Sequence, residues 1–195
     1  MALRGIGAAA WGGVCLVVLA GVVYGLWSTR SDAGNAAIAR EQVASLDLPM
    51  RTGDSGLPLP RFVTLKADRV NVRRGPSGDH KVSWVFTRKG LPVEIVAESD
   101  HWRRIRDSDG AEGWVYHSLL SGRRGVLVAP WSGARPVPLL DGVDAGSGPI
   151  ALLDSGVMAD VSQCTGDWCR VSIRGHRGWV EQAKLWGVYP GERVE

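Results

Sequence analysis

The sequence lacks the short motifs that mark the common catalytic sites. It contains no HExxH metal-binding motif, no GxSxG nucleophile elbow, no phosphate-binding P-loop and no glycine-rich dinucleotide fingerprint. The four histidines are scattered along the chain, at His80, His101, His117 and His176. Asp100 beside His101, and Asp107 near Asp109, fall where turns are expected, and turn chemistry explains these carboxylates without acid–base catalysis. We therefore expect that the protein is not an enzyme.

Cysteine is scarce, with only Cys15, Cys164 and Cys169 in 195 residues. A cysteine hydrolase needs a reactive thiol beside a base, but Cys15 lies in a long apolar run. The other two thiols alone do not complete a tetrahedral metal site, and no nearby histidine motif supplies the missing ligands. We expect neither a metal ion nor another cofactor.

Phenylalanine and tyrosine are also few, with two and three residues against nine tryptophans. The 26 glycines and 10 prolines favour tight turns over long helices. Hydrophobic residues make up 45% and charged residues 22%, which excludes a wholly disordered or collagen-like chain. The length suits one ordinary domain or two very small ones. Together these features favour a strand-rich architecture.

The net charge of +3 is distributed unevenly along the chain. Residues 1–60 carry four basic and four acidic side chains, residues 61–124 carry thirteen and eight, and residues 125–195 carry six and eight. The basic middle segment favours an anionic partner, such as a polymer, a membrane headgroup or nucleic acid. The alternative is a basic face that interacts only with solvent.

A long apolar run lies near the N-terminus. No charged residue occurs between Arg4 and Arg30, and residues 5–27 are almost entirely apolar or small. As a helix this run would extend about 35 Å, which is enough to cross the hydrocarbon core of a membrane. Trp11 and Trp27 flank it in the manner of interfacial anchors. The pattern predicts a transmembrane helix.

A cleaved secretory signal is the competing interpretation of residues 1–30, because Arg4 gives a short basic start and small residues at 33–39 offer a cleavage site. We favour the anchor, since the run exceeds the roughly 7 to 15 apolar residues of a signal peptide. Under both interpretations the rest of the chain is exported from the cytoplasm. It would be either anchored in the inner membrane with periplasmic domains or secreted to the periplasm. Residues 31–60, rich in small and polar residues, are predicted to form a flexible linker.

The remaining chain contains an internal repeat with an offset of 66 residues. The aligned positions are Gly90 with Gly156, Trp102 with Trp168 and, after a one-residue deletion, the Gly-Trp-Val segment at 113–115 with that at 178–180. The repeat divides the chain into two modules, residues 61–124 and 125–195. Each shows short β-branched or aromatic runs separated by glycine, proline, aspartate and serine. The prediction is an all-β fold with two small antiparallel barrels in tandem.

The first module carries an ordered set of motifs. It opens with Asn-x-Arg-x-Gly-Pro at residues 71–76, followed by Trp102 and then Gly-Trp-Val at 113–115. In this order the motifs resemble those of bacterial SH3-like domains of exported envelope proteins. The second module keeps Trp168 and Gly-Trp-Val at 178–180 but replaces the opening motif with PVPLLDGVD. The resemblance implies SH3-like barrels that bind without catalysis, commonly to cell-wall peptidoglycan or peptide segments. Because the second module lacks the opening motif, the resemblance implies ligand binding more strongly for the first module.

The two downstream cysteines flank a predicted hairpin turn. A two-residue turn at Gly166-Asp167 would put Cys164 opposite Cys169. Their Cα atoms would then be about 4.5 Å apart, which is compatible with a cross-strand disulfide in an oxidising compartment. Two free, buried thiols are the alternative. The matching positions of the first module are Glu98 and Arg103, for which we predict an ion pair.

Strand alternation predicts an aromatic and basic strip on the outside of the first module. The clearer pattern of the second module indicates that Ile105 and Val115 point inward while their neighbours point outward. The candidate ligand-binding residues are therefore Trp102, Arg104, Arg106, Trp114 and Tyr116. Such a strip can stack on sugar faces or on an extended peptide, with arginine binding carboxylates.

The strip prediction conflicts with one feature of the preceding strand. Val93, Ile95 and Ala97 would fall on the face of Trp102 across the hairpin, unless a bulge or a local core intervenes. Structural packing is the alternative role of each tryptophan, since large aromatic side chains are usually highly buried. Trp84 is a further candidate ligand-binding residue whose orientation the pattern does not define.

The leading hypothesis is an envelope protein whose first module binds cell-wall peptidoglycan or another anionic envelope ligand, while the second module stabilises or spaces it. The alternative is a protein-interaction scaffold that recruits an envelope enzyme or complex. A wall hydrolase would require a reactive site that the sequence does not supply. Nucleic-acid binding is disfavoured by export and by the acidic second module.

Overall fold

The computed structural model describes residues 51–131, 133, 135–144 and 146–195, which all belong to one compact unit. The predicted anchor or signal at residues 1–30 lies outside the described residues, as do residues 31–50 of the predicted linker. Within the described ranges, no helix is long and apolar enough to cross a membrane. What the structure describes is therefore the end of the predicted linker and the two modules.

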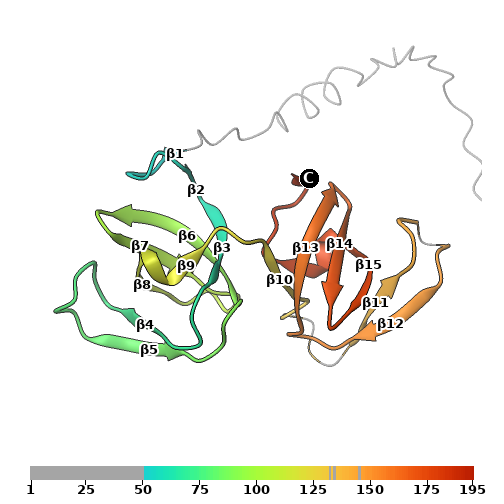
Figure 1. Ribbon diagram of the computed structural model, residues 1–195, viewed down its shortest axis with the longest axis horizontal. Helices are drawn as coiled ribbons and strands as arrows, with labels where there is room; N and C mark the ends of the chain where they lie inside the picture. Colours follow the sequence, from blue (N-terminus) through green and yellow to red (C-terminus); the bar gives the residue numbers. More distant parts are fainter. Residues whose placement is uncertain (1–50, 132, 134, 145) are drawn as a thin grey trace, which may run out of the picture. The chain divides into compact units, whose positions relative to one another are not determined.

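Seven antiparallel strands of the first module form one curved sheet in the order β5-β4-β8-β7-β6-β3-β9. The sheet curls into a small barrel (Figure 1), because the twist of the strands and the bulges in β4–β5 and β6–β7 bend it. Glycine, proline, aspartate and serine break the chain into short strands. A single 3-10 turn, η1 (His117–Leu119), precedes the last strand. The strands are β3 (Arg61–Leu65), β4 (Val70–Arg73), β5 (Val82–Phe86), β6 (Pro92–Ser99), β7 (Trp102–Arg106), β8 (Glu112–Tyr116) and β9 (Leu120–Ser121).

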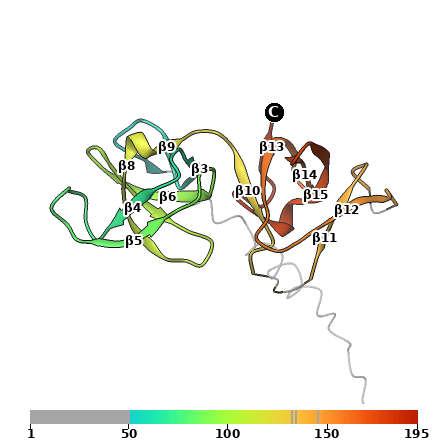
Figure 2. The same ribbon diagram turned by 60° about the horizontal axis from the view of Figure 1, so that its bottom comes forward.

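The second module repeats this topology. Its sheet runs in the order β12-β11-β15-β14-β13-β10-β16, and the short C-terminal strand β17 (Arg193–Val194) pairs with β13. The paired strands β11 and β12 extend beyond the rest of this barrel (Figure 2). The other elements are β10 (Gly125–Val128), β11 (Val137–Leu140), β12 (Pro149–Leu153), β13 (Met158–Thr165), β14 (Trp168–Ile173), β15 (His176–Glu181), η2 (Gln182–Lys184) and β16 (Leu185–Trp186). The predicted all-β class is confirmed for the described residues, which contain no α-helix.

Each barrel encloses its own core of aliphatic side chains. In the first module the fully buried residues include Val72, Ile105 and Val115. In the second they include Cys169 and Val171 of β14. The burial of these side chains supplies the main stabilisation of each barrel, since each of them removes most of its apolar surface from water.

A β-bulge in the β6–β7 hairpin explains how core and outer residues alternate along one strand. Ile95 lies opposite Ile105 inside the barrel, whereas Ala97 lies opposite Arg104 on the outside, so Val96 is an extra residue. The bulge removes the conflict in the predicted strip. The second module has the same register shift at the matching point of β13.

The tips of the two equivalent hairpins are joined by different chemistry. In the second module Cys164 lies opposite Cys169, and the two form a disulfide with a Cα separation of 4.1 Å. Gly166 begins the turn with a φ of +108°, which favours glycine. In the first module Glu98 lies opposite Arg103, whose Nε is 3.0 Å from the Glu98 carboxylate. Both the disulfide and the ion pair confirm the predictions.

Residues 51–60, predicted as the end of a flexible linker, instead form an ordered hairpin. Strand β1 (Arg51–Thr52) pairs with β2 (Pro58–Leu59). Between them, Ser55 donates hydrogen bonds from its backbone N–H and its hydroxyl to the Glu98 carboxylate, at 2.7 and 2.8 Å. The linker prediction is therefore wrong for these residues. Their hydrogen bonds to the Glu98 carboxylate hold the hairpin against the barrel.

The Glu98 side chain is only 1% exposed, and it gathers several donors. Arg61 and Arg103 both form ion pairs with it. A Cβ atom on Gly53 would overlap the Glu98 carboxylate, so glycine is needed where the hairpin approaches it. Desolvation alone would raise the pKa of Glu98, but the hydrogen bonds from Ser55 and Arg61 outweigh it and hold the pKa below the ordinary value.

The two modules are joined by a second buried carboxylate, Glu94, which is 3% exposed. It accepts a hydrogen bond at 2.9 Å from Arg106 Nε of its own barrel and one at 2.8 Å from the Tyr189 hydroxyl of the other. Phe62 packs beside this network, 5.1 Å from Trp186 and 4.7 Å from Tyr189 between ring centroids. Burial and the bond to Glu94 raise the pKa of Tyr189, so this phenol stays neutral as a donor.

The glycine of each Gly-Trp-Val segment marks a close approach between strands. A Cβ atom on Gly178 would lie 2.6 Å from the carbonyl oxygen of Leu140 and 2.7 Å from Cγ of Leu139. In the first module, a Cβ on Gly113 would meet Val72 in the same way. Only glycine lets β15 cross β11, and β8 cross β4, at this distance.

We expect Gly178→Ala to lower the free energy of unfolding by about 1–3 kcal/mol, because a methyl group would overlap backbone that cannot move freely. Gly148→Ala is the matched control, since a Cβ there meets nothing within 4 Å. The control should change stability by less than about 0.5 kcal/mol. Urea unfolding followed by tryptophan fluorescence measures both, and equal effects would contradict the close-approach explanation.

We expect Glu98→Gln to lower the free energy of unfolding by about 3 kcal/mol near pH 7, because two arginines lose their carboxylate partner. Since folding lowers the pKa of Glu98, its stabilisation is present above the ordinary value of 4.5 and is lost as the pH falls through the lower folded value. The difference between wild type and variant should therefore shrink from about pH 6 to about pH 3.

Chemical denaturation at several pH values measures this trend. Asp79→Asn, which removes an exposed carboxylate from the same barrel, is the control and should show no comparable dependence. A difference between wild type and Glu98→Gln that stays constant across the acid range would rule out the proposed role of the carboxylate.

Candidate functional site

Strands β7 and β8 bring most of the predicted strip onto one outer face of the first barrel. Trp102 lies opposite Tyr116, and Arg104 lies opposite Trp114. The indole of Trp102 and the ring of Tyr116 meet edge to face, with their centroids 5.4 Å apart. Tyr116 is exposed and Trp102 is half-buried. The Trp102 ring therefore packs against the Tyr116 ring, and part of the aromatic surface stays accessible to a ligand.

Two histidines extend this aromatic surface. His101 precedes Trp102, and His117 follows Tyr116, so the strand pairing brings them side by side with ring centroids 5.6 Å apart. The His117 backbone N–H donates to the His101 carbonyl at 2.9 Å. Each histidine taken alone in the sequence gives no sign of this pair, although the pairing of Trp102 with Tyr116 implies that the next residues face each other.

The two arginines of the predicted strip have different roles. Arg104 is exposed and forms an ion pair with Glu112 at 2.7 Å, within the outer face. Arg106 lies at the far end of β7, where its guanidinium binds Glu94 at the junction of the modules. That hydrogen bond raises the pKa of Arg106 above its ordinary value, although desolvation opposes the rise. The structure therefore assigns Arg106 to the module junction and leaves Arg104 beside the aromatic rings.

The other two candidate tryptophans, Trp114 and Trp84, lie in different parts of the barrel. Trp114 is half-buried opposite Arg104 on the outer face. Trp84 packs against the core and meets Phe86 edge to face, with a centroid distance of 6.0 Å. The structure thus brings Trp84 to the core of the barrel and away from Trp102.

The opening motif of the first module shapes the loop between β4 and β5. Arg73 Nη1 donates to the carbonyl of His80 at 2.6 Å, and the Arg74 N–H donates to the carbonyl of Lys81 at 3.1 Å. A Cβ atom on Gly75 would overlap the His80 ring. Arg73 and Gly75 of the motif therefore have structural roles in closing this loop.

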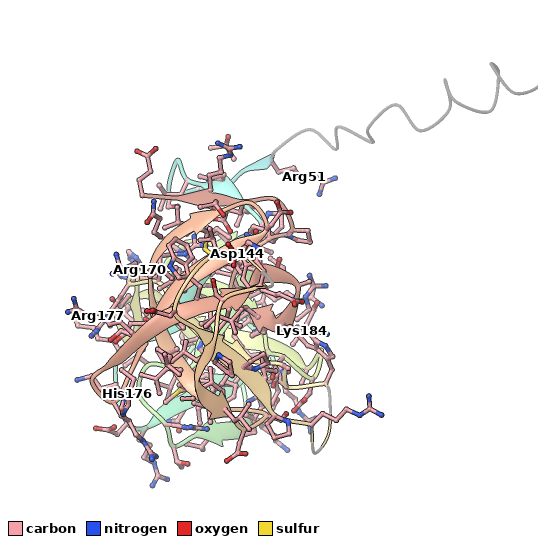
Figure 3. All side chains as sticks on the ribbon, turned by 90° about the vertical axis from the view of Figure 1, so that its right-hand side faces the viewer. Arg51, Asp144, Arg170, His176, Arg177 and Lys184 are labelled. Atoms are coloured by element: carbon pink, nitrogen blue, oxygen red, sulfur yellow. A yellow bond between two sulfur atoms is a disulfide. The ribbon has the colours of Figure 1, made fainter. Side chains whose placement is uncertain are left out.

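The second module lacks the aromatic cluster. Trp168 is half-buried on the equivalent outer face, opposite Glu181, where the first module has Tyr116. The histidine positions are occupied by Asp167 and by Gln182, whose buried amide donates to the carbonyl of Tyr189 at 2.8 Å. Neighbouring Arg170 and Arg177 point outward from β14 and β15 (Figure 3). The two copies therefore share a barrel but present different surfaces.

The outer face of the first barrel offers groups for binding and no metal centre. Among the described residues, no group of three or more histidine, cysteine, aspartate or glutamate side chains could hold a metal ion. The aromatic rings provide flat apolar surface for stacking, and Arg104 provides a donor for an anionic group. This arrangement suits recognition of a ligand that has both flat faces and carboxylates.

The family model described as "Bacterial SH3 domain" matches residues 66–122 and 133–187. These two segments make up more than half of the chain. The chain belongs to the bacterial SH3 domain family. The predicted tandem pair of SH3 domains is confirmed, and domains of this family are generally binding modules of the cell envelope.

No curated protein matches the sequence. Solved structures with similar coordinates include those of NlpC2 and NlpC1 from Trichomonas vaginalis, each with 10% sequence identity and a TM-score of 0.30. The likeness covers 65% and 72% of this chain, respectively, and 48% and 50% of those chains. This chain therefore matches about half the length of either structure, and at this TM-score neither likeness bears on the function of the SH3 domains.

Proposed function

We propose that the chain is a noncatalytic binding protein of the cell envelope, whose first SH3 domain holds cell-wall peptidoglycan on its outer face. Membership of the bacterial SH3 family supports an envelope-binding role. The apolar run at residues 5–27 would anchor the domains in the membrane, or would direct them to the periplasm if it is cleaved.

The observation that carries the proposal is the open aromatic cluster of the first domain. Trp102 and Tyr116 present their rings together, and His101 and His117 enlarge the same surface. Sugar rings stack on such flat surfaces, while Arg104 beside them can bind a carboxylate. Peptidoglycan carries both kinds of group, since its sugars bear peptides that end in carboxylates.

A binding role without catalysis agrees with the chemistry of the described residues. The thiols of Cys164 and Cys169 form a disulfide, so neither serves as a nucleophile. His101 and His117 pack against each other and against Tyr116. For either of these two histidines to act as the base of a hydrolase, a serine or cysteine nucleophile would have to lie beside it.

We expect Trp102→Ala to weaken binding to purified peptidoglycan by about thirtyfold, because truncating an aromatic anchor typically costs about 2 kcal/mol. The assay is co-sedimentation of the full chain, in a non-ionic detergent, with isolated cell-wall sacculi. The same supernatants are analysed for soluble wall fragments, which a noncatalytic protein does not release.

The matched control is Trp131→Ala, which removes another exposed tryptophan, 57% accessible, from the second domain. This variant should sediment like the wild type. Undiminished binding by Trp102→Ala would contradict the proposed surface, and release of wall fragments by the purified protein would contradict the noncatalytic role. Absence of wall binding together with crosslinking to a single envelope protein would favour the scaffold hypothesis instead.

A further inference from the structure

A groove with a volume of about 450 Å³ lies where the two SH3 domains meet, apart from the aromatic cluster. The first domain contributes the end of β3 and the turn before β6, and the second contributes the start of β13 and the end of β14. Ser121 and Arg123, near the end of the first domain, complete the lining. This volume is within the range of ordinary ligand sites and exceeds what a single small ion needs.

The groove is lined by four cationic side chains and one carboxylate. Lys66, Lys89 and Arg123 come from the basic first domain, and Arg174 comes from the acidic second domain. Asp160 is the one acidic residue in the lining, and it pairs with Arg123 at 2.8 Å. The other three cations are exposed and form no ion pair within the described part of the chain. The groove therefore has an excess of positive charge facing it from both domains.

The backbone at Arg174 is a second unusual feature of the groove lining. Arg174 has a φ of +46° and is followed by Gly175 at +89°, a turn that favours asparagine, aspartate or glycine in the first position. An arginine in the left-handed region costs about 1 kcal/mol or more, and such strain concentrates at functional positions. In the first domain the corresponding turn, at 107–110, carries two aspartates and does not line the groove.

We propose that this groove binds a phosphate-bearing anionic chain. Its cations approach from both walls, and a tetrahedral phosphate accepts hydrogen bonds and charge from several directions, whereas a planar carboxylate is bound mainly along its edge. Lys66 and Lys89 act as point charges, which suits phosphate. A recessed groove also admits a single strand more readily than the plane of a lipid headgroup layer. The site is separate from the peptidoglycan surface proposed above.

The test uses fluorescently labelled polyphosphate and the full chain in non-ionic detergent, at a series of salt concentrations. Lys66→Gln with Arg174→Gln removes one cation from each wall, and it should raise the dissociation constant at least about tenfold. It should also flatten the slope of log K against log[salt] by about 1 to 2, because about two phosphate contacts are lost. Thermal unfolding of the variant checks that the barrels remain folded.

The matched control is Arg74→Gln with Lys81→Gln, which removes one arginine and one lysine from the β4–β5 loop outside the groove. It has the same net charge as the groove variant and should bind polyphosphate within about threefold of the wild type. Equal losses in the two double variants would show that only overall charge matters and would overturn the proposal, as would failure of the wild type to bind polyphosphate.

Three further binding measurements distinguish the possible ligands. Polyglutamate of equal charge should bind at least about tenfold more weakly than polyphosphate, and equal binding would overturn the preference for phosphate. The two double variants should bind vesicles containing phosphatidylglycerol equally well. If only the groove variant lost vesicle binding, the proposal that the groove holds a single phosphate-bearing chain would be overturned. Trp102→Ala should retain full polyphosphate binding, so that failure at the peptidoglycan surface and failure at the groove are distinguished.

Discussion

The buried carboxylate of Glu94 depends on donors from both SH3 domains, and the arrangement of the chain depends in turn on this contact. A buried charge without partners would cost several kcal/mol, so Arg106 and the neutral phenol of Tyr189 must both remain beside it. Aromatic packing of Phe62 against Trp186 and Tyr189 adds apolar contact beside the network. This contact keeps one end of β7 at the junction of the domains and leaves the other end, with Trp102, open. It also fixes the two walls of the basic groove.

The duplication shows which parts of the fold are constrained by the barrel and which are not. Both copies keep the strand order, the bulge and the close-approach glycine, because each is needed to close a small sheet around its core. The hairpin tip, in contrast, is joined by a disulfide in one copy and by a buried ion pair in the other. The ion pair of Glu98 requires further donors, and the hairpin at residues 51–60 provides them. The outer faces have diverged most, since the cluster of His101 and His117 has no counterpart in the second copy.

Local patterns predicted much of this structure because their physics is local. The two-residue turn at Gly166 determines that Cys164 faces Cys169, and period-two alternation places Ile105 inside and Trp102 outside. Contacts between distant segments leave no such pattern. The sequence did not indicate that Glu98 would order a hairpin some forty residues earlier, or that Arg106 would leave the strip to bind Glu94. The basic groove also could not be predicted from the sequence, because its cations lie far apart in the chain and only the packing of two barrels brings them together.

Differential scanning calorimetry of the full chain tests most directly whether the two SH3 domains act as one unit. If the Glu94 contact couples them, both barrels unfold in a single transition, with equal calorimetric and van't Hoff enthalpies. Two separate transitions in the wild-type protein, each with the enthalpy of a single barrel, would contradict the account.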